Sequence, residues 1–150
     1  FLLNGGFKIF ISSEDDLPEK YINYKLEILP EKLHHVLAFA SLYIGEGATT
    51  ASECVMLGVP AIYINPLRAG TTDEQNSRGL LFQISNGNDL ISMINEVLNF
   101  EGFKNKFLEG RKKILLEKTD MTAFLVWFIE HYPESSSIMK SNPDYQYNFR

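Results

Sequence analysis

Residues 41–65 read SLYIGEGATTASECVMLGVPAIYIN and specify a strand, a glycine-rich turn, a helix and a second strand. The short apolar run 42–44 predicts a buried strand, and a turn with two glycines follows it. Residues 49–57 have apolar side chains at helical spacing, and the glycine and proline that come next end the helix. Residues 61–65 predict a second buried strand. A strand, a helix and a strand in this order form a β-α-β unit, in which both strands are parallel.

The same alternation continues on both sides of this unit. Short runs rich in β-branched and aromatic residues predict further strands at 8–12, 26–29 and 80–84. Periodic apolar residues predict further helices at 17–22, 30–39, 88–98, 103–116 and 119–131. The polar residues 66–78 are predicted to be a long connection. We therefore expect an α/β fold over residues 1–133, a Rossmann-like doubly wound parallel sheet in a three-layer α/β/α arrangement. Residues 134–150 are expected to be a tail with little regular structure.

The composition is that of a soluble globular domain. The chain has 150 residues, of which 45% are apolar and 22% charged. The net charge of -5 offers no basic surface for nucleic acid or an anionic membrane. The single cysteine, Cys54, excludes an intramolecular disulfide and favours a reducing compartment, so we expect a cytoplasmic protein, free or peripheral to the inner membrane. The longest apolar run, 123–129, is far shorter than the roughly 20 residues that span a bilayer.

The glycine-rich turn has the properties of an anion-binding site. It follows a predicted strand, and ligands of open parallel sheets bind at the carboxyl ends of strands. Gly45 and Gly47 permit positive φ and let a ligand approach the backbone closely. The backbone N–H groups of the first helical residues, Ala48, Thr49 and Thr50, combine with the helix dipole to favour a phosphate oxygen.

Glu53 lies one helical turn further on, about 5 Å along the axis. Its carboxylate is placed to accept hydrogen bonds from paired hydroxyls, such as a ribose diol. In the alternative interpretation the turn is an ordinary strand-to-helix connection and Glu53 is a solvated helix residue. The turn is not the dinucleotide fingerprint, because Thr50 stands where the third glycine belongs, and no Gly-Lys-Ser/Thr follows to make a P-loop.

The same segment resembles a known family. Its pattern is matched by Leu33-His34-His35, Ala40, Leu42, Ile44-Gly45, Gly47, Thr49, Glu53-Cys54 and Leu57-Gly58-Val59-Pro60-Ala61-Ile62. The segment is similar to the C-terminal domain of GT-B-type glycosyltransferases and of the related UDP-N-acetylglucosamine 2-epimerases. It most resembles a bacterial and archaeal family of GT-B-like proteins described only as a domain of unknown function. The resemblance covers residues 7–128 in the order of elements and is specific over residues 33–65.

The resemblance implies a role for each part of the site. The residues from Gly45 to Thr50 would contact the diphosphate of a nucleotide sugar, expected to be UDP-linked, and Glu53 the ribose. The segment 70–76 would lie near the sugar, where Asp73, Glu74 and Gln75 match an acidic residue and a glutamine of several GT-B enzymes. Proteins of this type generally need no metal, and we expect no cofactor besides the nucleotide sugar itself.

Two positions depart from the family pattern. Thr50 stands where the family usually has methionine, and Glu46 replaces a small residue or serine. A carboxylate beside a phosphate is repulsive unless it points away from it. Glu46 therefore argues against diphosphate binding at this turn unless its side chain is directed outward.

Two adjacent histidines lie near the start of the predicted helix 30–39, which comes before the strand predicted at 42–44. His34 and His35 point about 100° apart on a helix, so they cannot both face one site or form a metal pair. Histidine is readily tuned for acid–base chemistry at neutral pH. We take His34 as the candidate ligand-binding residue, and a purely structural role for both as the alternative.

The last predicted helix is apolar on nearly every side over residues 121–129. Such a helix must be covered on most of its surface, and core packing accounts for most of this requirement. The resemblance implies that the rest contacts an N-terminal domain of the same polypeptide, because this chain starts within a pattern and not at a methionine. Without that domain, the helix is expected to favour weak homo-oligomers.

Three functions remain open at this point. The leading hypothesis is the nucleotide-sugar-binding half of a glycosyltransferase in envelope or surface-polysaccharide synthesis, inactive alone because the acceptor site and the catalytic base belong to the other half. The first alternative is an isomerase of the UDP-sugar 2-epimerase type. The second is a non-catalytic binding module on the same fold.

Overall fold

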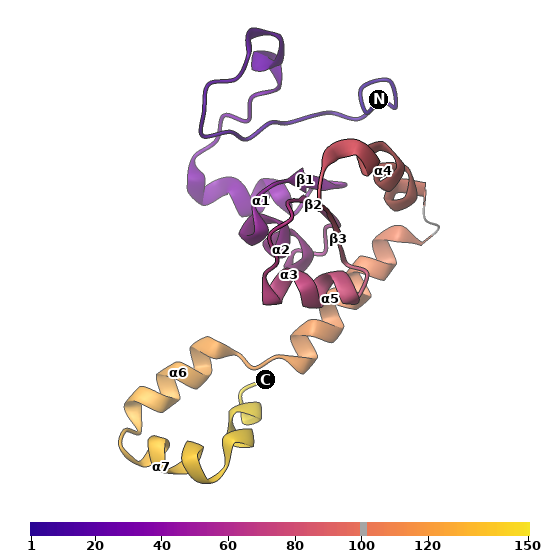
Figure 1. Cartoon of the computed structure of the whole chain (residues 1–150). Helices are drawn as coiled ribbons and strands as arrows, with labels where there is room; N and C mark the ends of the chain where they lie inside the picture. The colour runs from indigo at the N-terminus through magenta and orange to yellow at the C-terminus, as the bar shows by residue number, and fades with distance from the viewer. Residues whose placement is uncertain (100–101) are drawn as a thin grey trace.

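The computed structural model describes residues 1–99 and 102–150, which form a mixed α/β fold around a small parallel sheet (Figure 1). Three strands pair within the described residues: β1 (Tyr43–Gly45), β2 (Ala61–Ile64) and β3 (Leu81–Ile84). Their order is β1-β2-β3, with Ile44 opposite Ile62 and Ile62 opposite Phe82. The strands predicted from the central segment and from residues 80–84 are therefore confirmed to within one residue.

One face of the sheet is covered by the helices that connect its strands. These are α2 (Ala48–Met56) and α3 (Gly70–Ser77), which pack against one another as well as against the sheet. Ala61, Tyr63 and Leu81 alternate along their strands onto this face and are buried together with Cys54. The long helix α5 (Phe103–Glu117) completes the layer with Phe107 and Ile114.

The opposite face of the sheet is covered by α4 (Leu90–Asn99), which follows the short 3-10 turn η3 (Gly87–Asp89). Ile62 and Ile84 point to this side and pack with Ile94 of α4. The N-terminal residue Leu2 joins the same cluster. The sheet thus has apolar side chains on both faces, as a parallel sheet between helices requires.

The segment before β1 differs from its prediction. Neither 8–12 nor 26–29 forms a strand, and an isolated parallel bridge between Ile11 and Lys25 is what remains of their pairing. The intervening residues form the 3-10 helix η1 (Glu19–Tyr24). The physical reason is that two short strands are marginal by themselves and need a third neighbour or a packed face. The predicted helix 30–39 is also shorter, divided into η2 (Pro30–Lys32) and α1 (Leu33–Leu37).

The polar stretch after β2 was expected to be a connection, and the structure instead places α3 within it. Thr72 and Gln75 are buried on one side of this helix, so its polar composition conceals an ordinary pattern of inward and outward positions. Gly79, at φ +66°, ends the segment in the left-handed conformation that glycine favours. A connection of residues 65–69 remains at the carboxyl end of β2.

The C-terminal residues also correct the prediction of an irregular tail. After α6 (Met121–Glu130) the chain forms α7 (Glu134–Ser141) and the 3-10 helix η4 (Pro143–Asn148), which fold back on α6. Trp127 stacks on Tyr145 with ring centroids 4.8 Å apart, and Phe149 packs beside both. Aromatic residues scattered through a polar sequence thereby build a second apolar cluster, apart from the sheet (Figure 1). Leu125, Val126 and Ile129 of α6 remain about half exposed or more, at 48%, 50% and 72%.

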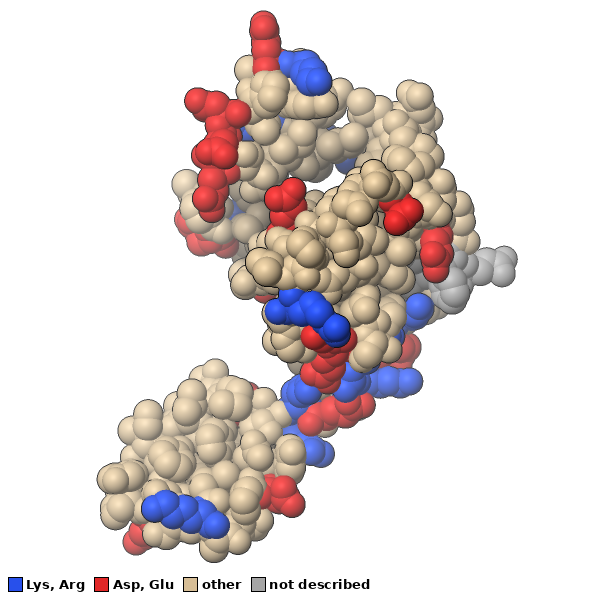
Figure 2. Space-filling view, in the orientation of Figure 1, with Lys and Arg blue, Asp and Glu red and all other residues tan. Residues whose placement is uncertain are grey.

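A cluster of ion pairs joins α3 to the end of α5. Arg78 contacts Glu74 at 2.8 Å and Glu117 at 2.6 Å, while Lys118 contacts Glu74 at 2.8 Å. The hydrogen bond from Lys118 lowers the pKa of Glu74, and that from Arg78 lowers the pKa of Glu117. Figure 2 shows acidic and basic side chains interleaved along this part of the molecule. Ion pairs that are this accessible to solvent contribute little to the stability of the fold.

No helix in the described part of the chain combines the length and the apolar character that crossing a bilayer requires.

Candidate functional site

A cleft of about 800 Å³ lies between the N-terminal segment and the edge of the sheet. One wall is formed by residues 7–14, and the other by residues 39–47 together with Thr50 at the start of α2. Gly45 and Gly47 are part of that second wall. The predicted anion-binding turn therefore borders a cavity large enough for a nucleotide-sized molecule.

The start of α2 leaves its backbone donors available in the way the sequence predicts. Gly47 is the residue before the helix, with φ -87°, and no side chain caps the helix there. The N–H groups of Ala48, Thr49 and Thr50 belong to the first turn, where an α-helix has no internal acceptors for them. An anion at this end of α2 would also be stabilised by the helix dipole.

Gly45 is required for a reason other than positive φ, whereas nothing in the structure requires glycine at position 47. Among the described glycines, positive φ occurs at Gly6, Gly58, Gly79 and Gly102, so neither Gly45 nor Gly47 uses the positive φ that glycine permits. A Cβ on Gly45 would lie 2.3 Å from the hydroxyl oxygen of Tyr43, whose ring folds over this glycine. A Cβ on Gly47 would meet its nearest neighbours at an ordinary 3.7 Å. Gly45 thus makes room for a side chain of its own strand.

Tyr43 is a site residue that the sequence interpretation missed. Its hydroxyl is hydrogen-bonded to the Thr50 side chain and to the backbone of Gly47, at the place where a ligand oxygen was expected. Burial raises the pKa of Tyr43 above its ordinary value, so the hydroxyl stays protonated and can donate a hydrogen bond to an anion. The available signal was its position two residues before Gly45, because such residues share one face of a strand.

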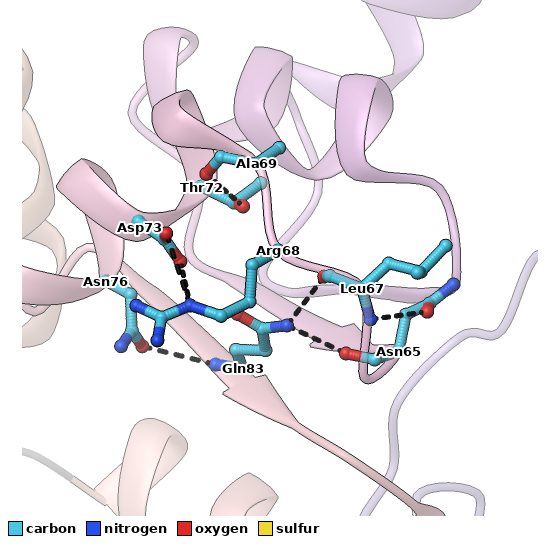
Figure 3. Close-up of polar contacts among 8 residues, drawn as sticks. All are labelled: Asn65, Leu67, Arg68, Ala69, Thr72, Asp73, Asn76 and Gln83. Carbon is cyan, nitrogen blue, oxygen red and sulfur yellow. Dashed lines mark hydrogen bonds and ion pairs between the residues drawn. The ribbon is translucent and has the colours of Figure 1, made fainter.

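Glu46 lies between the two glycines of the turn and has an exposed side chain, while its backbone carbonyl accepts a hydrogen bond from Asn65 Nδ2 at 3.4 Å. Asn65 also accepts from the N–H of Leu67 at 2.9 Å. Gln83 of β3 donates to the carbonyls of Asn65 and Leu67 at 2.7 and 2.8 Å (Figure 3). These bonds tie the carboxyl ends of all three strands together, which gives the turn a firm base.

His34 and Glu53 were predicted separately and the structure brings them together. His34 Nε2 lies 3.1 Å from Glu53 Oε2, joining α1 to α2 across the protein surface. Their side chains are 59% and 39% exposed, and neither lines the cleft. For Glu53 to contact a ligand at the turn, its carboxylate must either bond the ligand and His34 at the same time or break its contact with His34.

Asp73 and Gln75 both belong to α3 and have partners within the protein. Asp73 accepts hydrogen bonds from Arg68 Nε at 3.0 and 3.2 Å, at the start of the helix (Figure 3). Gln75 is 6% exposed and donates to the carbonyl of Ser52, which holds α3 against α2. The structure thus separates these two residues from the cleft, and gives Gln75 a packing contact.

Cys54 is fully buried in α2, and burial together with the Glu53 carboxylate raises its pKa to about 12. We expect the native thiol to be unreactive toward dithionitrobenzoate at mildly alkaline pH and to react once denaturant unfolds the chain. Because the folded pKa lies above the unfolded value of roughly 8.5, the stability linked to this group is complete below the unfolded value. It falls as the pH rises toward the folded value. Rapid labelling of a natively folded sample, followed by absorbance, would contradict this assignment.

The described residues contain no group of three or more His, Cys, Asp or Glu side chains arranged to hold a metal ion. No protein-family model matches the chain, and no curated protein and no solved structure matches it either.

Proposed function

We propose that this chain is the nucleotide-sugar-binding part of a GT-B-like glycosyltransferase, and that its glycine-rich turn receives the donor diphosphate. The observation that carries the proposal is the position of this turn. It lies at the carboxyl end of β1, borders the cleft of about 800 Å³, and leads into a helix whose first N–H groups have no side-chain cap. Parallel sheets bind phosphates in this setting because the helix dipole and the N–H groups act on the same oxygen.

We also propose a specific arrangement for the α/β fold. Helices on both faces of a parallel sheet support a Rossmann-like, doubly wound domain in three layers, which would form one half of a GT-B protein. Transfer would then require the other half of the polypeptide, and the cytoplasmic location inferred from the single cysteine belongs to the same proposal.

Different residues at the turn would bind different groups of the donor. The N–H groups of Ala48, Thr49 and Thr50 would bind one phosphate, with the Tyr43 hydroxyl turning from Gly47 to donate to it. The exposed Glu46 side chain is free to turn toward solvent, which removes its repulsion of the phosphate. Glu53 would accept from the ribose hydroxyls after exchanging its contact with His34.

Titration of the folded chain with UDP, UDP-N-acetylglucosamine and uridine, followed by NMR, tests this assignment. We expect millimolar binding, with UDP at least about tenfold tighter than uridine because the diphosphate supplies charge-assisted hydrogen bonds. The largest shifts should come from the amides of Gly47 to Thr50. No response to any of the three at millimolar concentration would refute nucleotide binding.

Glu53→Gln and His34→Ala form a matched pair for the ribose contact, since each breaks the same ion pair from one side. Loss of the carboxylate should weaken UDP binding by about tenfold, whereas loss of the imidazole should leave it unchanged or slightly tighter. Equal weakening by both variants would show that the pair acts by holding α1 against α2 and not by binding ribose.

A non-catalytic nucleotide-binding module is the second candidate. It is favoured by the mutual contact of His34 and Glu53, two residues predicted to bind the ligand, which lie outside the cleft. The same titrations, repeated on a protein that also carries the proposed second half, separate the two candidates. Conversion or release of the sugar would show an enzyme, while binding without turnover would show a module.

A further inference from the structure

The cleft beside β1 contains an open edge of the sheet. Tyr43 N–H donates to Pro60 O at 3.0 Å, on the β2 side, so the N–H and C=O of the next residue, Ile44, point to the opposite side. These two groups have no hydrogen-bond partner among the described residues, and Ile44 lines the cleft in a partly buried position. Unpaired backbone groups away from water cost free energy, and an open strand edge is a template for another strand.

The opposite wall of the cleft, formed by residues 7–14, also has unpaired backbone groups. Ile11 N–H donates to Tyr24 O at 2.7 Å, and Ile11 C=O accepts from Leu26 N–H at 2.8 Å. Both groups of Ile11 point toward this bridge, so the same groups of the preceding residue, Phe10, point away from it. Phe10 has no backbone partner in the part of the chain that the structure describes. Each wall of the cleft thus contains an extended segment with free donors and acceptors.

Apolar side chains from both layers of the fold border the cleft. Leu2 and Leu98 line it and belong to the cluster around Ile94, on the α4 side of the sheet. Leu33 and Leu37 of α1 line it as well and belong to the cluster on the α2 side. Both apolar layers that cover the sheet therefore continue past β1. A strand in the cleft would be covered on both of its faces, as β2 is.

The backbone edge and the apolar layers together determine which kind of molecule fits. A hydrocarbon would fill the apolar layers but leave the N–H and C=O of Ile44 unpaired, and a sugar would place hydroxyl groups against leucine side chains. An extended peptide meets both requirements, because its backbone bonds to the edge while its side chains alternate between the two layers.

We propose that the cleft binds an extended apolar segment of a partner polypeptide, which adds a strand to the sheet beside β1. The segment has about five residues, the common length of a strand, with apolar side chains on both faces. A second copy of this chain fits less well, because its own β1 edge lies inside the same cleft and cannot meet this one directly. The strand runs beside residues 42–44 and leaves the first turn of α2 to the nucleotide, so the inference goes beyond nucleotide binding and does not depend on it.

Titration with a synthetic peptide, followed by NMR and amide hydrogen exchange, tests the proposal. The probe has the β2 sequence AIYI between two lysines that keep it soluble, and its control is the same peptide N-methylated at each of these four residues. We expect the probe to bind with a dissociation constant below about 1 mM and to slow exchange of the Ile44 amide at least about tenfold at saturation. The control should bind at least about tenfold more weakly, because it keeps the side chains but lacks the donors for the edge.

Two variants at position 44 form a matched pair. Ile44→Pro removes the outward N–H but no hydrogen bond between β1 and β2, and proline is tolerated in edge strands. Ile44→Val keeps the N–H and should bind the probe as the parent does. A folded Ile44→Pro variant should bind at least about tenfold more weakly, and undiminished binding by it would contradict the proposal. The exchange of the parent's Ile44 amide decides the question if Ile44→Pro does not fold.

Three results with the parent chain would also overturn the proposal. Failure of the probe to shift β1 resonances at millimolar concentration would mean that the edge accepts no strand. Equal binding of the N-methylated control would identify an apolar pocket and not a strand edge. Slow exchange of the Ile44 amide without peptide would show the edge already closed, by residues 8–11 if it is independent of protein concentration and by a second copy if it increases with concentration. No nucleotide is present in these samples, so they stand whether or not UDP binds.

Discussion

Replacing Gly110 by alanine is expected to lower the free energy of unfolding by about 1–3 kcal/mol, the range found when a packed core is overfilled. Gly110 lies inside α5, where a Cβ would come within 2.3 Å of Leu80 Cδ2 and 2.8 Å of Cδ1. Leu80 is 2% exposed, so its side chain has little room to move away. The usual gain of up to about 1 kcal/mol for Gly→Ala within a helix is smaller than this clash.

Urea unfolding with matched variants distinguishes the clash from helix propensity. Gly87→Ala is the control, because a Cβ at Gly87 meets nothing within 4 Å, and we expect a change within about 0.5 kcal/mol. In a Leu80→Ala background, the Gly110→Ala change should become neutral or stabilising, since the contacting methyl groups are gone. An unchanged penalty in that background would show that Leu80 is not the cause.

Alanine at Gly45 is expected to cost about 1–3 kcal/mol as well, and to weaken nucleotide binding by at least about tenfold. The new Cβ would lie 2.3 Å from the Tyr43 hydroxyl oxygen and 2.7 Å from its Cζ, so the ring must leave its place. Its hydrogen bonds to Thr50 and to the Gly47 backbone would break with it. The substitution would therefore destabilise the turn and disorder the proposed phosphate site at the same time.

Gly47→Ala is the matched control for this prediction. Its φ of -87° suits any residue, and its Cβ would meet Thr50 Oγ1 and the Tyr43 hydroxyl at 3.7 Å. We expect thermal unfolding of Gly47→Ala near that of the parent, with UDP binding retained. If alanine at Gly47 is as damaging as alanine at Gly45, the two glycines act through the turn backbone and the role given to Tyr43 is wrong.

Several elements were predictable because the local pattern and the tertiary environment agree. The runs at β1, β2 and β3 are short and mainly apolar, which suits a parallel sheet covered on both faces, and β1 is the strand that stays only partly buried. The same holds for α2, where Ala51, Cys54 and Val55 form one buried stripe between glycine boundaries. In α3 the pattern misled, because its inward positions hold Thr72 and Gln75, polar residues that a composition-based interpretation assigns to a surface loop.

The sequence by itself determined the β-α-β core and the location of a glycine-rich turn at a strand end, because periodicity and the choice of glycine act over a few residues. Only the tertiary structure decided which side chains lie beside the turn and which contacts they make. It placed the Tyr43 hydroxyl over Gly45, joined His34 to Glu53, and separated Asp73 and Gln75 from the cleft. It also left residues 8–12 and 26–29 outside the sheet, although their sequence favours strands. A strand requires a paired neighbour, and among the described residues these two segments pair with one another only at the bridge between Ile11 and Lys25.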